Sequence, residues 1–335
     1  MRFVYIGLGT LVLFVVALMT GAVDIPATEV LGILMGKDTE NTVWRVIVLE
    51  SRLPMAMTAL LSGASLSIAG LMLQTTFQNP LAGPSILGVS SGASMGVAIV
   101  MLLGGGVLAS AGALQYVSVI AGAIAGAAAV ILLLLGLSSS LRSSAMLLIA
   151  GIMLSYLASS VISLLNFFAP ADGVKSFVVW GLGSFGGVTA SELPLFCTVL
   201  AAALFSSALF IKPLNALLLG ERYTANMGYS VKRLRSLLLC LSGILTAFVT
   251  AFCGPIGFIG IVVPHIARMI FKTSNHSILI PATMLCGAAL TLACSVLTTI
   301  PGSSGVLPIN AITPVIGVPV IIYILIQRRS LRYFN

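Results

Sequence analysis

The side chains that could perform acid–base, nucleophilic or metal chemistry are few in this sequence, and they do not cluster. His265 and His276 have no second ligand at a spacing typical of metal sites, so we expect both to be hydrogen-bonded structural residues. The cysteines occur singly in apolar stretches without a CxxC pair, as Cys197, Cys240, Cys253, Cys286 and Cys294. The sequence therefore predicts no metal site and no catalytic site in this chain.

Two polar, proline-containing stretches have the composition of a path through a membrane. The first runs over residues 74–92 and contains Pro80 and Pro84, and the second runs over residues 253–265. Proline interrupts a helix and frees backbone groups, which at membrane depth are tolerated only inside protein or beside a water-filled cavity. These stretches are therefore candidate linings of a transport path.

The longest hydrophilic stretch, residues 212–235, has the pattern of a docking segment. Short helix-forming pieces end at Gly220 and Gly228, and the stretch closes with a basic cluster at residues 232–235. This pattern predicts two small helices that lie along a membrane surface. The segment could bind a soluble protein, and the alternative is a solvated loop that only orients the chain.

The chain carries no motif for hydrolysing ATP by itself. Its Gly36-Lys37 pair is followed by Asp38 and lacks the earlier glycine of a phosphate-binding loop. No charged residue is expected in the middle of a span, which argues against an ion-coupled carrier, because such carriers keep a buried charge for coupling. No cofactor is therefore expected on this chain, and if ATP drives the protein, ATP and Mg²⁺ bind to partner ATPase chains.

The elements that must position these segments are membrane helices. Of the 335 residues, 59% are hydrophobic and only 7% are charged, and the mean hydropathy is +1.17, which excludes an ordinary soluble domain. Unbroken apolar runs predict helices, because a β-barrel would show alternating polarity. A faint repeat, residues 60–63 against 240–243, favours two inverted halves. The predicted spans are residues 3–23, 54–77, 86–104, 113–136, 144–168, 190–211, 236–253, 256–271, 278–298 and 307–326.

Glycines at four-residue spacing predict how some of these spans pack. Gly88, Gly92 and Gly96 share one face of the third span, and Gly122 and Gly126 share one face of the fourth. Such spacing lets two helix backbones approach closely. We interpret it as packing within one chain rather than as a dimer contact.

The charged residues orient the bundle. With Met1 on the inner side, twelve of the sixteen basic residues and one of the eight acidic residues fall in inner segments, which gives +11 inside and −3 outside. Basic loops resist translocation, so both termini are predicted to be cytoplasmic and residues 24–53 to be periplasmic. Topology and anionic membrane lipid explain the net charge of +8, and nucleic-acid binding is not expected.

A series of short motifs runs through the chain in a fixed order. They are Arg52-Leu-Pro54, Gln74, Asn79-Pro-Leu-Ala82, Leu87-Gly-Val-Ser-Ser-Gly92, Leu147-Leu-Ile-Ala-Gly151, Trp180, Gly183-Ser-Phe-Gly186, Gly220-Glu-Arg222, Gly228, Gly254-Pro-Ile-Gly-Phe-Ile-Gly260, Val263-Pro-His-Ile-Ala-Arg268, Leu307-Pro-Ile309 and Gly317-Val-Pro319. Together they resemble the membrane permease of type II ABC importers, which take up iron(III)-siderophores, haem and vitamin B12. The resemblance implies an all-α polytopic membrane protein, a single permease domain over residues 1–335 with about ten transmembrane helices and an inverted-repeat fold.

The resemblance also implies an assembly in the cytoplasmic (inner) membrane. A second permease copy, most simply as a homodimer, would enclose a central path, with two ABC ATPase subunits below it and a periplasmic or lipid-anchored substrate-binding protein above it. The implied cargo is an iron(III)-siderophore or a similar chelate, with vitamin B12 and haem as alternatives. The alternative of another class is an ion-coupled secondary transporter.

Site residues follow from the matched positions. Docking of the ATPase is implied for Glu221, Arg222, Ala225 and Gly228. The cytoplasmic gates are implied at Asn79, Leu81, Ser143 and Ser144. For the path we expect polar residues of the fifth span that no motif marks, Ser155, Ser159 and Asn166. Docking of the binding protein is implied for Arg52, and we expect the neighbouring Arg45 to assist it.

The chain departs from the family pattern at three outer positions. Met55 replaces the second arginine of an Arg-Leu-Pro-Arg motif, Thr299 replaces an arginine before the tenth span, and Val306 replaces the acid of a Glu-Leu-Pro motif. Charge pairs at an interface rim mainly set association rate and register. These departures therefore bear on how the binding protein docks and leave the fold prediction unchanged.

Overall fold

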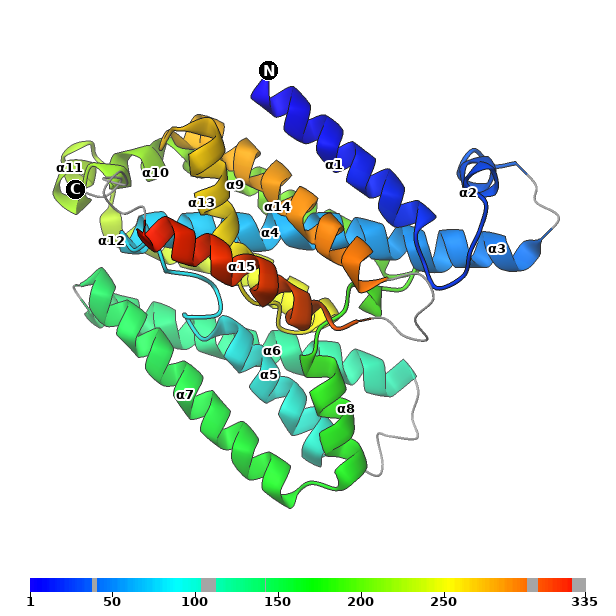
Figure 1. Ribbon diagram of the computed structural model, residues 1–335. Helices are drawn as coiled ribbons and strands as arrows, with labels where there is room; N and C mark the ends of the chain where they lie inside the picture. Colours follow the sequence, from blue (N-terminus) through cyan, green and yellow to red (C-terminus); the bar gives the residue numbers. More distant parts are fainter. Residues whose placement is uncertain (38–40, 104–112, 142, 300–306, 327–335) are drawn as a thin grey trace.

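The computed structural model describes residues 1–37, 41–103, 113–141, 143–299 and 307–326, and this part of the chain is a bundle of helices (Figure 1). Asp38 and Val306 lie outside the described residues. The helices are α1 (Arg2–Met19), α2 (Ala27–Leu34), α3 (Thr42–Val46), α4 (Leu53–Phe77), α5 (Val89–Ala98), α6 (Ala113–Ser140), α7 (Ser144–Phe168), α8 (Ala171–Gly181), α9 (Leu193–Ser207), α10 (Ile211–Leu218), α11 (Glu221–Asn226), α12 (Val231–Cys253), α13 (Ile259–Phe271), α14 (His276–Thr298) and α15 (Ile309–Ile326).

Every predicted span coincides with a helical stretch. Seven stretches in the described part of the chain are long and apolar enough to cross a membrane. Three shorter apolar helices, Val89–Leu103, Ile259–Phe271 and Ile309–Tyr323, occupy the remaining predicted spans. The all-helical prediction is confirmed.

The helix of the second predicted span begins earlier than predicted. Residues 24–53 were expected to connect the first two spans, but α3 runs through a π-helical turn, Ile47–Arg52, straight into α4. The helix is therefore continuous over Thr42–Phe77. Charged residues at the start of this stretch suggested a boundary at residue 54, but Arg45 and Glu50 remain exposed along the helix, so their charges do not end it.

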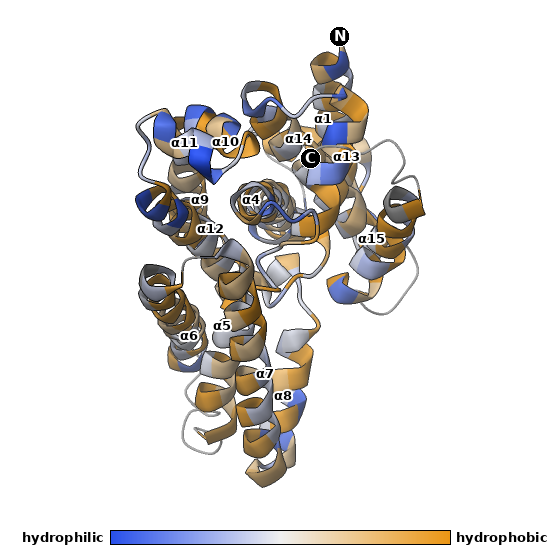
Figure 2. Cartoon of the chain, turned by 90° about the vertical axis from the view of Figure 1, so that its left-hand side faces the viewer, coloured by the Kyte–Doolittle hydropathy of each residue, from blue (hydrophilic) through white to orange (hydrophobic). Residues whose placement is uncertain are grey.

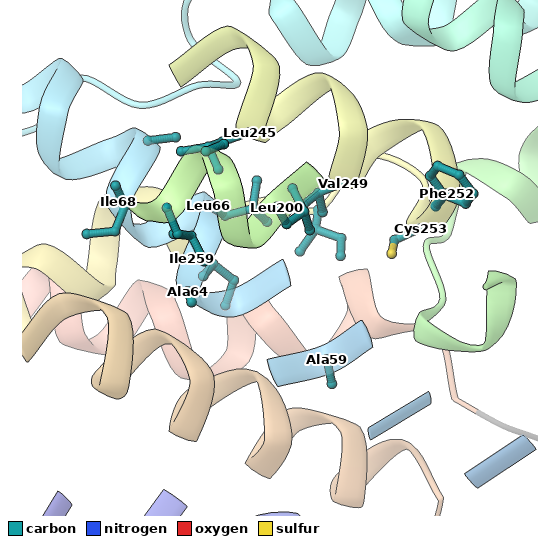
Figure 3. Close-up of a cluster of buried hydrophobic side chains, with 14 of the residues drawn as sticks. Ala59, Ala64, Leu66, Ile68, Leu200, Leu245, Val249, Phe252, Cys253 and Ile259 are labelled. Carbon is teal, nitrogen blue, oxygen red and sulfur yellow. The ribbon is translucent and has the colours of Figure 1, made fainter. Parts of the chain in front are cut away.

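Helix α4 is the centre of the bundle. Twenty of its 25 residues are buried, and Figure 2 shows it end-on among α9, α10, α12, α13 and α14. A helix that is covered on all sides needs small or apolar residues on every face. Figure 3 shows the result, in which Ala59 and Ile68 of α4 belong to one apolar cluster with Leu200 of α9, Leu245 of α12 and Ile259 of α13.

The glycine spacings of the third and fourth spans meet each other within the chain. A Cβ on Gly96 would overlap the carbonyl oxygen of Gly122, and a Cβ on Gly126 would overlap that of Gly92. The prediction of packing within one chain is therefore confirmed. Gly88 differs from the prediction, since it precedes α5 and lies against Gly151 of α7. Residues 92–96 also match a Gly-x-Ser-x-Gly pattern around Ser94, but this serine lies inside α5 rather than on the strand-to-helix turn of a hydrolase nucleophile.

The two halves of the bundle make corresponding contacts. α4 packs on α14 as α12 packs on α6, and α5 packs on α6 and α7 as α13 packs on α14 and α15. α4 and α12 run in opposite directions, since Ser62 Oγ lies 3.6 Å from Cys253 Sγ toward one end, and Leu73 and Leu239 line one cavity toward the other. The arrangement agrees with the inverted halves that the faint sequence repeat favours.

One end of the bundle carries α10, α11, the start of α12 and the end of α4, and we call it the docking end (Figure 1). The N-terminus lies at the same end. Arg2 Nη1 donates to the carbonyl oxygen of Ile270 at 2.7 Å, and the rings of Phe3 and Phe271 lie 4.5 Å apart. The opposite, outer end carries α2, α3 and α8.

Candidate docking and translocation site

The segment predicted as two small helices is α10 followed by α11. Gly220 and Gly228, at the two ends of α11, have φ angles of +100° and +86°. Backbone of this conformation is readily available only to glycine, which is why these two residues end the short helices. This part of the sequence prediction is confirmed.

The surface of α11 combines charge with exposed apolar side chains. Arg222 and Ala225 are both exposed. Next to them the side chains of Leu219, Tyr223 and Met227 are 63%, 50% and 54% exposed. Exposed apolar side chains gathered on a charged helix at the end of a bundle form a surface suited to a protein partner.

Glu221, the first residue of α11, joins the docking segment to the start of α7. Its Oε1 accepts a hydrogen bond from Arg235 Nη2 at 2.6 Å and a second from Ser144 Oγ at 2.8 Å. The structure thus brings a predicted docking residue against a predicted gate residue. Arg235 is only 5% exposed, so it is not part of a solvated basic cluster, because Glu221 compensates its charge.

The other predicted gate residues lie where α4 ends and where α7 begins. Gln78 ends α4 in the left-handed conformation, with φ +47°. Asn79 Oδ1 then accepts from the backbone N–H of Leu81 at 2.9 Å, which shapes a tight turn and leaves Leu81 39% exposed. Ser143 directly precedes α7, but its side chain makes no capping hydrogen bond to that helix.

The predicted path residues share one face of α7. Ser155 is half-buried and donates to the carbonyl oxygen of Gly151 at 3.0 Å, Ser159 is exposed, and Asn166 is half-buried with no hydrogen bond recorded at its Oδ1. Their spacing of four and eleven residues places them on one stripe of the helix. In the apolar stretch of α7, only 17% of the residues are buried, whereas 83% are buried in the stretch that contains α4. α7 therefore has a large surface that this chain does not cover.

Sequence reasoning missed a buried polar contact beside residues 78–84, the loop that carries the predicted gate residues Asn79 and Leu81 and that we call the gate loop. Arg268 is 3% exposed, and its Nη1 donates to Gln74 Oε1 at 2.7 Å, while Gln74 Nε2 donates to the carbonyl oxygen of Ile261 at 3.1 Å. Arg268 lies in the last turn of α13, so the expectation of no charge in the middle of a span holds for it, but its burial was not expected. The glutamine inside the apolar run of α4 was the available signal, since a buried polar side chain requires a partner.

Both histidines are hydrogen-bonded, as predicted. His265 Nε2 lies 2.8 Å from the carbonyl oxygen of Pro80, which ties α13 to the gate loop. His276 is the first residue of α14 and is fully buried, although the predicted span began two residues later. Its ring bonds to Asn215 and Thr75.

At the outer end, the two predicted docking arginines have different surroundings. Arg52 is 5% exposed and donates to the carbonyl oxygens of Leu18 at 3.1 Å, of Met19 at 2.8 Å and of Val23. It therefore satisfies free carbonyl groups in the last turn of α1 and, at Val23, just after that helix. Arg45 is exposed on α3.

Two of the three positions that depart from the expected charge pattern, Met55 and Thr299, lie around Arg52. Met55 and Thr299 are half-buried and line, with Arg52, a cavity of about 250 Å³ at the outer end of α1, α4 and α14. Two further cations here would stand beside a guanidinium that is already buried. The uncharged residues are therefore compatible with the buried position of Arg52.

The chain is similar in sequence and in fold to known transport proteins. Residues 9–327 match the model of the FecCD transport family. A vitamin B12 import system permease protein, BtuC, from Serratia proteamaculans (strain 568) is 35% identical over 326 residues, which cover 97% of this chain and 92% of the relative. The protein of the same name from Klebsiella pneumoniae subsp. pneumoniae is 34% identical over 286 residues, covering 85% and 84%. A solved structure of a metal-chelate type ABC transporter, in an inward-facing conformation, superposes with a TM-score of 0.84 at 28% identity, covering 97% of this chain and 98% of the other.

Proposed function

Because the chain belongs to the FecCD transport family and is a multi-pass membrane permease of an ABC importer, we propose that it carries a metal chelate along a path beside α7. An iron(III)-siderophore is the first expected cargo, and vitamin B12 and haem are the alternatives. Relatives named as vitamin B12 import permeases and a structural neighbour described as a metal-chelate type transporter support this class. His265 and His276 are engaged with the chain itself, which suits a cargo whose metal is already wrapped.

The contact between Glu221 and Ser144 is the observation that carries this proposal. Separate ATPase subunits hydrolyse ATP in this family, so a permease must transmit their motion to its own path. Glu221 begins the docking helix, and Ser144 begins α7, the helix with the proposed path residues Ser155, Ser159 and Asn166. A displacement of α11 therefore acts directly on the inner end of α7.

The proposed topology has ten membrane crossings, with both termini in the cytoplasm, in a single permease domain over residues 1–335. The seven long helices together with the three short apolar ones supply these crossings. The contact of Arg2 with Ile270 supports an N-terminus at the docking end, and the basic residues at 232–235 favour a cytoplasmic position for that end. Residues 24–53 would then be periplasmic, and residues 212–235 would face the ATPase.

The proposed assembly is a homodimer of this chain with two ABC ATPase subunits and a substrate-binding protein. The poorly covered surface of α7 supports a second copy around a shared path. The exposed surface of α11, with Arg222, Ala225 and Gly228, is the proposed ATPase contact, and ATP and Mg²⁺ would bind the ATPase subunits alone. Surrounding lipid would contact the remaining apolar surface.

At the outer end we assign Arg45 the direct electrostatic contact with the binding protein. Arg45 is exposed, whereas the guanidinium of Arg52 is buried against α1. Arg52 therefore supports the docking surface by holding the end of α1 in place. Exposed rim charges act mainly on association rate, which makes Arg45 testable by its salt dependence.

The proposal is tested by purifying the protein in mild detergent with its native partners and determining their identity and stoichiometry by mass spectrometry. Two ATPase chains with two copies of this permease are expected. The complex is then placed in liposomes and supplied with ATP, the binding protein and either an iron(III)-hydroxamate siderophore or vitamin B12. ATP-dependent uptake of one chelate supports the proposal, and the cargo that is taken up decides between the alternatives.

An ion-coupled carrier makes opposite predictions. Its uptake would be abolished by an ionophore and would not depend on ATPase subunits. Recovery of this chain without an ATPase, even after gentle cross-linking, together with uptake that an ionophore abolishes, would contradict the importer proposal. Ser144→Ala provides an internal comparison, because removal of its hydrogen bond to Glu221 should reduce uptake per ATP hydrolysed only if the docking helix is coupled to α7.

A further inference from the structure

A series of hydrogen bonds at the docking end joins α10 to α4 through His276, the first residue of α14. Oδ1 of Asn215 accepts from the backbone N–H of His276 at 2.8 Å and from Nδ1 of the same residue at 2.9 Å. On the other side of the ring, Nε2 lies 3.0 Å from Oγ1 of Thr75. His276 is 0% exposed and Thr75 is 1% exposed, so water does not compete for the bond between them, whereas Asn215 is half-buried.

The direction of each hydrogen bond follows from the geometry. A backbone N–H can only donate, so the Asn215 atom that faces His276 is the amide oxygen, and Nδ1 of His276 must carry a proton to bond it. The amide nitrogen of Asn215 donates to Oδ1 of Asn275 at 3.0 Å, and that oxygen also accepts from the backbone N–H of Ser277 at 2.9 Å. In a neutral ring, Nε2 can only accept from the hydroxyl of Thr75, whose one proton is then shared with the carbonyl oxygen of Leu71, also at 3.0 Å. The chain of bonds therefore runs in one consistent direction from α4 to α10.

A second contact holds α10 to the same end of α4. Nε2 of Gln78 donates to the carbonyl oxygen of Leu217 at 3.0 Å. Leu214 and Leu217 are 0% and 4% exposed, so the inner face of α10 is also packed in the apolar core. α10 is thus fixed to α4 by both polar and apolar contacts, and the following α11 is separated from it only by Leu219 and Gly220.

Thr75, at the α4 end of this series of hydrogen bonds, lies next to the start of the gate loop. The carbonyl oxygen of Thr75 accepts from the backbone N–H of Gln78 at 3.3 Å, and that of Gln74 accepts from Asn79 at 3.1 Å. The loop over residues 78–84 begins here and carries Asn79 and Leu81. A shift of Thr75 therefore moves the base of this loop.

We propose that Asn215, His276 and Thr75 are positioning residues that form a relay from the docking helix α11, through α10, to the gate loop over residues 78–84. The relay rests on the proposed docking of an ATPase at α11. It is separate from the Glu221 to Ser144 contact, which acts on α7, so the docking segment reaches both gates by different routes. Because the relay consists of directional bonds in a buried site, loss of one hydroxyl is enough to interrupt it.

The test uses the complete importer, with its ATPase subunits, in lipid nanodiscs. Thr75→Val removes the hydroxyl at nearly constant shape, and Thr75→Ser retains it. Thr76→Val is the matched control, since both hydroxyls bond within their own helix, that of Thr75 to the carbonyl oxygen of Leu71 at 3.0 Å and that of Thr76 to the carbonyl oxygen of Met72 at 2.7 Å. Only the hydroxyl of Thr75 also contacts the ring of His276. Each variant is combined with Leu81→Cys, and the rate of thiol labelling at this position is measured with and without ATP plus vanadate, using the chain without Leu81→Cys as the blank.

We expect Thr75→Val to reduce the nucleotide-dependent change in labelling rate about tenfold, within the usual range of coupling between sites, while ATP hydrolysis by the same complex stays unchanged. Thr75→Ser should restore the response, and Thr76→Val should leave it intact. Asn215→Leu breaks the relay at its α10 end and should have the same effect as Thr75→Val.

A full nucleotide response in assembled Thr75→Val or Asn215→Leu complexes would overturn the relay while leaving the proposed function in place. An equal loss in Thr76→Val would also overturn it, because the effect would then belong to any hydroxyl in this turn. If the unmodified chain assembles with no ATPase at all, the proposed function fails, and the relay fails with it.

Discussion

Replacing Glu221 by glutamine is expected to remove about 1–2 kcal/mol of coupling with Arg235, intermediate between the effects known for exposed and buried pairs. The side chain of Arg235 is 6% exposed and that of Glu221 is 43% exposed, with 2.6 Å between Nη2 and Oε1. Breaking a fully buried pair costs about 3–5 kcal/mol, and a fully exposed pair contributes about 0.2–1 kcal/mol. Since one partner is buried and the other is partly hydrated, the expected coupling lies between these limits. Glutamine keeps an oxygen for the hydroxyl of Ser144, so the substitution tests the charge.

The assay is a double-mutant cycle of Glu221→Gln and Arg235→Met, with the free energy of unfolding measured by SDS titration in mixed micelles. Lys232→Met, at an exposed position on the same helix, provides the control cycle and should be additive with Glu221→Gln within about 0.5 kcal/mol. A coupling of Glu221 with Arg235 no larger than that of the control would refute the reasoning. The charge of Arg235 would then be compensated without Glu221, and the start of α11 would not depend on this pair.

Three further substitutions test the packing and the outer surface. Gly96→Ala should lower the free energy of unfolding by about 1–3 kcal/mol, because its Cβ would overlap the carbonyl oxygen of Gly122. Gly7→Ala is the control and should not lower it, since a Cβ there has nothing within 4 Å. Equal effects of the two substitutions would contradict the close helix contact. Arg52→Lys should speed amide hydrogen exchange after α1, since an ammonium group cannot reproduce the guanidinium's bonds to three carbonyl groups, and unchanged exchange would remove this role. Arg45→Ala should slow association of the binding protein severalfold and flatten its salt dependence in surface plasmon resonance, and unchanged kinetics would exclude Arg45 from the docking surface.

The positions of the helices were predictable because the membrane restricts the possible structures. An apolar run of sufficient length must satisfy its own backbone, so hydropathy alone locates α1, α6, α7, α12 and α14. The docking helices were also predictable, since Gly220 and Gly228 end them locally. The continuous helix from α3 into α4 was missed, because exposed charges at its start suggested a boundary that no backbone feature imposes.

From the sequence, the proposed gate and docking residues could be named only as two separate sets. Family resemblance named Glu221 in one loop and Ser144 at the start of a distant span, but no local pattern indicates that they share a hydrogen bond. The surroundings of Arg52 and Arg268 were likewise hidden, since sequence hydropathy treats a basic residue as solvated. In the structure both are buried, because carbonyl groups and the amide of Gln74 satisfy them.

The sequence by itself determined that this chain is a helical membrane protein and indicated its family, since composition, apolar run length and short motifs are local properties. Only the tertiary structure decided which polar groups meet. Thr75, Asn215 and His276 lie on three different helices, and each alone reads as an isolated polar residue in or beside an apolar segment. Their partners are set by helix packing, and packing depends on contacts between residues far apart in the sequence, which no local pattern encodes.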